Sequence, residues 1–173
     1  MKLTTLFIIG LFFLPLNANA HGPTPQKADE KIVINASIEK TWEILKDFDN
    51  ISTWHPDVKS SKGDGKNKSD SVRAMTLSND EETEESLDYY SEKDHEYSYR
   101  LKGENTKAFP ISSHTSAIQL IAEGDKTLVK WKSRFYRGDT GNSPSEKLND
   151  ESATKAMNQF IQNGLKGLKE TLE

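Results

Sequence analysis

The chain has 173 residues, with 23 lysines and arginines against 27 aspartates and glutamates, so its net charge at pH 7 is −4. This mild negative charge disfavours nucleic acid as a partner, since phosphate binding needs clustered positive charge. The chain contains no cysteine, which excludes disulfide bonds and thiol chemistry. A chain of this length can instead be held together by a single hydrophobic core.

The first twenty residues predict a secretory signal peptide. Lys2 precedes an apolar run over Leu3–Leu14, and Ala18 and Ala20 match the small-residue pattern of a cleavage site after Ala20. The run is too short for a membrane-spanning helix, which needs roughly 20 apolar residues. We therefore expect a soluble periplasmic protein, not attached to a membrane, that begins at His21 and carries a net charge of −5 because Lys2 is removed.

Residues 21–30 (HGPTPQKADE) contain two prolines and little apolar material, which predicts an extended arm of weak order. A single domain over residues 31–173 is expected to follow, because no linker or internal repeat interrupts it. It should open with a strand over Lys31–Ala36 and a short amphipathic helix over Ile38–Phe48 with Ser37 as its N-cap.

Alternation of apolar and polar residues predicts strands in the middle of the chain. The expected strands are Ser71–Ser78, Ser86–Glu92, Tyr97–Leu101, Ile111–Glu123 and Thr127–Arg137. The EGDK sequence between the last two suits a tight hairpin. Apolar residues then recur at helical spacing from Ala153 to Leu172, so a long amphipathic helix should close the chain.

This order predicts an α+β fold of the helix-grip type, in which a curved antiparallel sheet wraps around the long C-terminal helix. The sheet has one apolar face and the helix one apolar stripe, and each can cover the other. A curved sheet and a helix rarely fill all the space between them, so we expect a cavity, the usual place for a ligand.

Three segments resemble the START/Bet v 1-like superfamily, also called the SRPBCC or polyketide cyclase/dehydrase-like group. They are ASIEKTWEILKDFDNISTWHPDV (36–58), SVRAMTL (71–77) and LVKWKSRFY (128–136). Within that superfamily, HGPTPQK at residue 21, FYRG at 135 and GLKGLKETL at 164 are similar to the MxaD-type accessory proteins of periplasmic methanol oxidation. The resemblance implies a helix-grip fold and a non-enzymatic role in the interaction of methanol dehydrogenase with its cytochrome c.

The Trp54-His55-Pro56 sequence follows the first helix and has two interpretations. Pro56 disfavours helical geometry at His55 and favours an extended exit, so the segment can be a packed corner at the end of the sheet. Alternatively, His55 points into the cavity and bonds a ligand. A catalytic histidine normally needs a paired nucleophile or carboxylate, and neighbouring Asp57 should point away from His55.

Residues expected to face the interior are the candidate ligand-binding residues, with Phe109 as a lid at the cavity mouth. Inward aromatic residues at period 2 are more often plain core, but an inward histidine, serine or tyrosine hydroxyl needs a hydrogen-bond partner. The candidates are Trp54, His55, Tyr97, Tyr99, Phe109, His114, Trp131, Ser133, Phe135, Met157, Phe160 and Ile161.

No cofactor is expected, and the histidines lack the spacing of a zinc site. His21 would become the amino-terminal residue after cleavage, where its amine and imidazole could chelate Cu(II); the alternative is an unordered terminus without metal.

The NDEETEE sequence (79–85) departs from the ordinary hairpin turn that the resemblance implies at this place. Such a charge run is either a solvated turn or a surface that steers the protein onto a basic partner. The candidate partner-binding residues are Asp80, Glu81, Glu82, Glu84 and Glu85.

These observations leave three hypotheses for function. The first is an adaptor that binds methanol dehydrogenase, its cytochrome c or both, without chemistry of its own. The second is a carrier for a small apolar or aromatic molecule in the cavity. The third is a cyclase-like enzyme that uses His55 or His114 as acid or base, which would need a substrate within reach of one of them.

Overall fold

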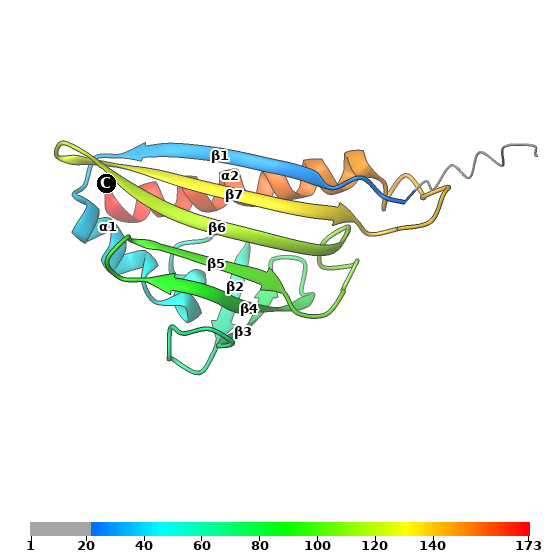
Figure 1. The fold of residues 1–173 in the computed structure, drawn as a ribbon, viewed down its shortest axis with the longest axis horizontal. Coiled ribbons are helices and arrows are strands. Elements are labelled where there is room, and N and C mark those ends of the chain that lie inside the picture. Colours follow the sequence, from blue (N-terminus) through cyan, green and yellow to red (C-terminus); the bar gives the residue numbers. More distant parts are fainter. Residues whose placement is uncertain (1–21) are drawn as a thin grey trace, which may run out of the picture.

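A computed structural model describes residues 22–173, so the expected signal peptide and His21 lie outside the described residues. These residues form one antiparallel sheet and two α-helices (Figure 1). The elements are β1 (Gln26–Ile34), α1 (Ile38–Leu45), a 3-10 helix η1 (Phe48–Thr53), β2 (Val58–Lys62), β3 (Val72–Leu77), β4 (Glu82–Ser91), β5 (Glu96–Leu101), β6 (Ile111–Glu123), β7 (Lys126–Arg137) and α2 (Asp150–Leu172).

The sheet has seven strands in the order β1-β7-β6-β5-β4-β3-β2. Figure 1 shows α2 running behind β1 and β7, along the inner side of the curved sheet. This is the expected α+β helix-grip architecture. Within residues 22–173, no helix combines the length and the apolar character needed to cross a membrane.

The β6–β7 hairpin forms where it was expected. Its two-residue turn places Gly124 at a φ of +67°, a left-handed conformation that costs glycine little because it has no Cβ. The two strands then pair from Glu123↔Lys126 along nearly their whole length. Together they form the longest pairing of the sheet.

The first strand corrects the expected boundary of the N-terminal arm. β1 begins at Gln26, inside the segment expected to be weakly ordered, and pairs with β7 from Gln26↔Phe135 to Ile34↔Thr127. An edge strand gains its backbone hydrogen bonds from its neighbour and needs few apolar residues. The polar sequence of residues 26–30 therefore hid the strand.

The segment after β1 also differs from the expectation. Ser37 caps α1 through its side chain, but α1 ends at Leu45, and Asp47 caps the separate 3-10 helix η1. The edge strand β2 has the sequence VKSSK, and Val58 is its single buried residue. One apolar residue does not produce an alternating pattern, so the sequence did not predict this strand.

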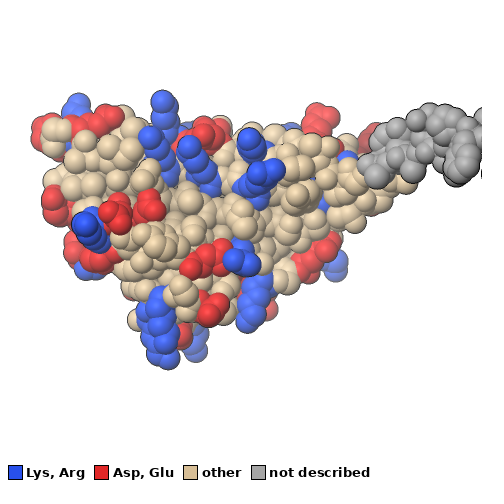
Figure 2. Space-filling view, viewed as in Figure 1, with Lys and Arg blue, Asp and Glu red and all other residues tan. Residues whose placement is uncertain are grey.

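The inner face of the sheet and the apolar stripe of α2 form the core. The alternation expected for β7 is confirmed, since Val129, Trp131, Ser133 and Phe135 are all buried. The buried residues of α2 are Ala153, Met157, Phe160, Ile161, Gly164, Leu165, Gly167, Leu168 and Leu172. The outer face of the sheet carries charged side chains (Figure 2).

Candidate functional site

The interior cavity between the sheet and α2 is much smaller than the sequence led us to expect. Its volume is ≈ 10 Å³, about enough for one water molecule. The lining residues are Glu85, Tyr99, Phe109, His114, Ser116, Trp131, Met157 and Phe160. Rings account for the small volume, because Trp131 and Phe160 pack edge to face with centroids 6.0 Å apart.

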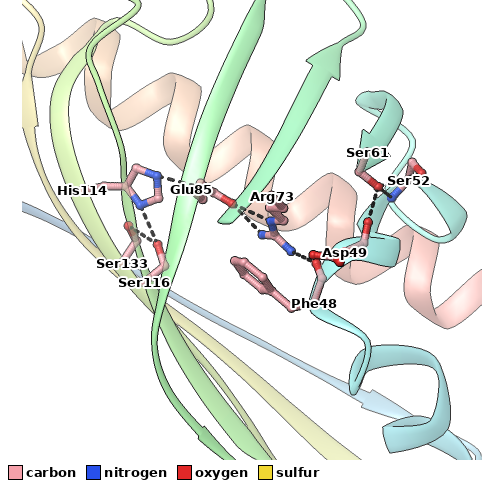
Figure 3. A network of polar contacts seen from close by, with 9 residues as sticks. All are labelled: Phe48, Asp49, Ser52, Ser61, Arg73, Glu85, His114, Ser116 and Ser133. Atoms are coloured by element: carbon pink, nitrogen blue, oxygen red, sulfur yellow. Dashed lines mark hydrogen bonds and ion pairs between the residues drawn. The ribbon is translucent and has the colours of Figure 1, made fainter. Parts of the chain in front are cut away.

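A chain of buried polar side chains crosses the inner face of the sheet beside this cavity (Figure 3). Arg73 of β3 donates to the Phe48 carbonyl at 2.7 Å and to a Glu85 carboxylate oxygen of β4 at 2.8 Å. The other Glu85 oxygen lies 3.1 Å from His114 Nε2 of β6. The network therefore links strands β3, β4 and β6 to the start of η1.

Two serines extend the chain beyond His114. His114 Nδ1 lies 3.0 Å from Ser116 Oγ, and Ser116 Oγ donates to Ser133 Oγ at 2.9 Å. Ser116 and Ser133 are direct cross-strand partners in the β6–β7 pairing, which is why their hydroxyls meet. Each of these side chains has a polar partner inside the protein, as buried polar groups require.

The charges of the network stabilise one another. Burial by itself raises the pKa of Glu85, but Arg73 and then His114 outweigh it, so the pKa of this carboxyl lies below its usual value. An ionised Glu85 can only accept hydrogen bonds, so it is the acceptor in its contacts with Arg73 and His114. The Arg73 guanidinium also stacks on Phe48, 4.1 Å from the ring centroid, which adds cation–π stabilisation.

The structure corrects one of the candidate partner-binding residues, since Glu85 is not on the surface. Its side chain is 4% exposed and faces inward. In β4, residues of one parity face the core, and Glu85 shares its parity with the fully buried Leu87. The same signal identifies Arg73, which shares its parity with buried Met75 and Leu77. The acidic composition of the run concealed this alternation.

The other four acidic residues lie at the β3–β4 turn and on the outer side of β4. Asp80 forms an ion pair with Lys59, and Glu84 lies 3.8 Å from Lys102. Glu81 accepts a hydrogen bond from Asn105. Local basic and polar groups thus balance part of this run, while Glu82 stays exposed.

Trp54, His55 and Pro56 form the corner that joins η1 to β2, and this corner packs on α2. The His55 ring stacks on Phe160 with centroids 4.0 Å apart. A Cβ on Gly164 would lie 2.6 Å from the His55 ring, and a Cβ on Gly167 would lie 2.2 Å from the Trp54 carbonyl oxygen. The two glycines therefore let the corner approach the helix closely, which explains why α2 contains glycine at these positions although glycine lowers helix stability.

His55 does not line the interior cavity. Its Nδ1 accepts the Asp57 backbone N–H at 3.2 Å. Burial, followed by the charge of Arg73, lowers the pKa of His55 to about 3, so the ring is neutral near pH 7. Trp54 and His55 instead border a surface groove of ≈ 280 Å³ beside Gly167.

The remaining ligand-binding candidates divide between the cavity and the plain core. Tyr99, Phe109, His114, Trp131, Met157 and Phe160 line the cavity. Ser133 reaches it through Ser116, whereas Tyr97, Phe135 and Ile161 are buried core residues outside its lining. Sequence reasoning missed Arg73 and Ser116, and it placed Glu85 on the surface instead of in the interior.

Phe109 and Phe160 separate the cavity from the surface. Their rings meet edge to face with centroids 4.9 Å apart, and both also line an outer pocket of ≈ 210 Å³. Asp57, Ser78 and Asn79 contribute polar groups to this outer pocket. The two rings therefore lie between this outer pocket and the polar chain at Glu85 and His114.

The Ser116–His114–Glu85 order has the residue types of a hydrolytic triad, but its geometry differs from one. Glu85 also holds Arg73, and Ser116 donates its proton to Ser133. A volume of ≈ 10 Å³ leaves no place for a substrate next to Ser116 in this conformation. Within residues 22–173, no three or more His, Asp or Glu side chains are grouped so that they could hold a metal ion.

Comparison with solved structures supports the fold. An uncharacterised protein from Bacillus thuringiensis is 24% identical, with a TM-score of 0.70 over 85% of this chain and 98% of that one. XoxI from Bacillus cereus is 23% identical, with a TM-score of 0.68 over 84% and 94% of the two chains. Ara h 8.0201 is 16% identical, with a TM-score of 0.66 over 86% and 98%.

No curated protein matches the sequence significantly. A family model described as polyketide cyclase / dehydrase and lipid transport matches residues 25–173, which is the whole sheet together with α2. The chain therefore belongs to the polyketide cyclase / dehydrase and lipid transport family.

Proposed function

We propose that the protein is an exported, non-enzymatic accessory protein that acts by binding other proteins through its exterior. The observation that carries this proposal is the closed interior, where the polar groups of Arg73, Glu85, His114 and Ser116 bond one another around a space of ≈ 10 Å³. Such an interior stabilises the fold and leaves the outer surface for function.

The sequence resemblance supplies the partner system. HGPTPQK, FYRG and GLKGLKETL are similar to the MxaD-type proteins, and the first twenty residues have the pattern of an export signal. The proposed partners are therefore methanol dehydrogenase and its cytochrome c in the periplasm. In this role the protein aligns or concentrates two redox proteins and takes part in no chemical step.

Reconstitution tests this function directly. Electron transfer from purified methanol dehydrogenase to its cytochrome c is measured with and without the mature protein, at several salt concentrations. We expect the protein to accelerate the reaction, and we expect this acceleration to decrease as added salt screens the charges. A rate that does not change at any salt concentration would overturn the proposal.

A carrier function is the second candidate, and the Phe109–Phe160 contact favours it. These two rings line both the outer pocket of ≈ 210 Å³ and the interior cavity. The indole N–H of Trp131 is buried and has no hydrogen-bond partner in the described part of the chain, so a ligand entering past the rings would find a free donor.

The carrier hypothesis predicts that a small molecule accompanies the protein. Native mass spectrometry of protein purified from its own host should then show an added mass. The Phe109→Ala variant should change the fraction of protein that carries this mass. The dye 8-anilinonaphthalene-1-sulfonate offers a second measurement, since F109A should bind it more strongly than the wild type does. Consistently empty protein with equal dye binding would exclude the carrier.

A further inference from the structure

The outer face of β1 and β7 carries a row of positive charges that we call the basic strip. It consists of Lys27, Lys31, Lys130, Lys132 and Arg134. Figure 2 shows Lys and Arg side chains standing over these two strands. Because every second residue of a strand faces the same side, about 7 Å apart, the row extends along the sheet as a continuous surface.

The register of the two strands places like charges against each other. Lys31 lies opposite Lys130, and Lys27 lies opposite Arg134. Like charges directly opposite each other on one face of an antiparallel pair destabilise the sheet. Such a pairing is unfavourable for the isolated fold, and it becomes favourable when an anionic surface lies above it.

The chain itself neutralises little of the basic strip. Asp29 is the one acidic residue between these cations on the outer face of β1, and it lies 3.4 Å from Lys132 with both side chains more than half exposed. An exposed pair of this kind contributes little. No other ion pair to the strip occurs within residues 22–173, although the whole chain has a net charge of −4.

The surroundings of the basic strip suit a protein interface. A hollow of ≈ 210 Å³ lies beside it, bordered by Lys130, Lys132 and Tyr89. Tyr89 is 44% exposed, and Val33, at the end of β1, is 38% exposed. Exposed tyrosine and arginine are both enriched at protein–protein interfaces, and the net negative charge of the whole chain disfavours a nucleic acid as the partner.

We infer that the basic strip is a docking surface for an acidic face of a partner protein, with Tyr89 inserted at its border. This inference rests on the proposed accessory function for the identity of the partner, and it names the surface and the charge that the partner presents. It assigns the docking role to β1 and β7, at the opposite edge of the sheet from β2 and β3 and apart from the acidic run 80–85.

Poly-L-glutamate serves as a defined probe that represents the acidic surface of a partner protein. A strip variant carries Lys31→Gln, Lys130→Gln and Arg134→Gln, and a matched control carries Lys93→Gln, Lys155→Gln and Lys166→Gln, which removes three exposed lysines elsewhere. We expect the strip variant to bind the probe about tenfold more weakly than wild type at low salt, as the loss of three weak ion pairs implies.

The control variant should bind poly-L-glutamate nearly as wild type does. Equal losses in both variants, or no binding by the wild type, would overturn the inference. Binding of double-stranded DNA or of anionic phosphatidylserine vesicles without binding of poly-L-glutamate would also overturn it, because a different class of partner would then fit the strip.

The same variants in the reconstituted electron-transfer assay separate this inference from the proposed function. If the wild type accelerates the reaction and the strip variant does so equally, the function holds and the docking surface is wrong. If the wild type does not accelerate it but binds poly-L-glutamate through the strip, the docking surface holds and the methanol-oxidation role is wrong.

Discussion

The Arg73 guanidinium lies 2.6 Å from the Glu85 carboxylate, and the two side chains are 1% and 4% exposed. Removal of one partner leaves an uncompensated charge in the core. We therefore expect Glu85→Gln to lower the free energy of unfolding by about 3 to 5 kcal/mol, measured by urea denaturation and circular dichroism. Glu84→Gln, on the exposed side of the same strand, should change it by less than about 0.5 kcal/mol.

The double variant Arg73→Met/Glu85→Gln sharpens this test. It removes both charges, so no buried ion is left without a partner, and it should be more stable than E85Q alone. If the losses in unfolding free energy of R73M and of E85Q simply add up to the loss of the double variant, then packing, and not the ion pair, accounts for the effect.

His55 makes stability depend on pH. A histidine side chain free in water has a pKa of 6.5, whereas burial, followed by the charge of Arg73, lowers the pKa of His55 to about 3 in the folded protein. Below pH 6.5 the unfolded chain therefore binds a proton that the folded chain excludes, and stability falls as the pH decreases. The loss reaches at most about 1.4 kcal/mol per pH unit.

The measurement compares unfolding free energies between about pH 7 and pH 5, above the range in which the lowered pKa of Glu85 adds its own acid-dependent loss. His55→Phe keeps a ring against Phe160 but cannot titrate, so its stability should vary less with pH. Ile161→Val is the control, because it removes one buried methyl group and should lower stability equally at each pH. Identical slopes for H55F and wild type would contradict the assignment.

The sequence predicted the fold correctly where apolar residues recurred at one regular spacing along a whole strand or helix. The inward positions of β7 and the apolar stripe of α2 follow directly from the alternation of Trp131 with charged neighbours and from the helical spacing of Met157, Phe160 and Gly164. Edge strands were harder to predict from the sequence. β1 and β2 obtain their stability from backbone pairing, and a polar residue such as Lys59 does not indicate that pairing.

The site was predicted less completely because its central residues are charged. Arg73 and Glu85 are each outside the usual set of core residues, and each is tolerated because the other is present on the neighbouring strand. Cross-strand pairing brings them together, and it cannot be read from either strand alone. The small cavity volume was equally hidden, since it depends on how Phe160 and Trp131 pack.

Gly164 and Gly167 should not tolerate alanine, although alanine favours a helix by roughly 1 kcal/mol. A Cβ at 164 would lie 2.7 Å from a Trp131 ring carbon as well as 2.6 Å from His55. Both rings are buried, so overpacking of about 1 to 3 kcal/mol should exceed the gain. Gly167→Ala should cost more, because its nearest contact is the backbone oxygen of Trp54.

Thermal and urea unfolding can measure both glycine variants. Gln159→Ala, at an exposed position of the same helix, is the control and should be neutral or slightly stabilising. A G164A protein that gains stability to the same extent as Q159A would show that the corner does not press on α2 there.

Lys31→Glu tests whether the basic strip sacrifices stability for binding. The substitution turns the Lys31↔Lys130 repulsion into an opposite-charge pair on the same face of the sheet, so it should raise the free energy of unfolding by roughly 0.2 to 1 kcal/mol. Lys31→Gln only removes the repulsion, so its free energy of unfolding should lie between those of K31E and wild type. Added salt should reduce the gain in stability of both variants. Because the same change weakens the positive surface, K31E should also bind poly-L-glutamate less tightly. A variant that is more stable and binds equally well would separate the two properties and show that this lysine pair does not contribute to docking.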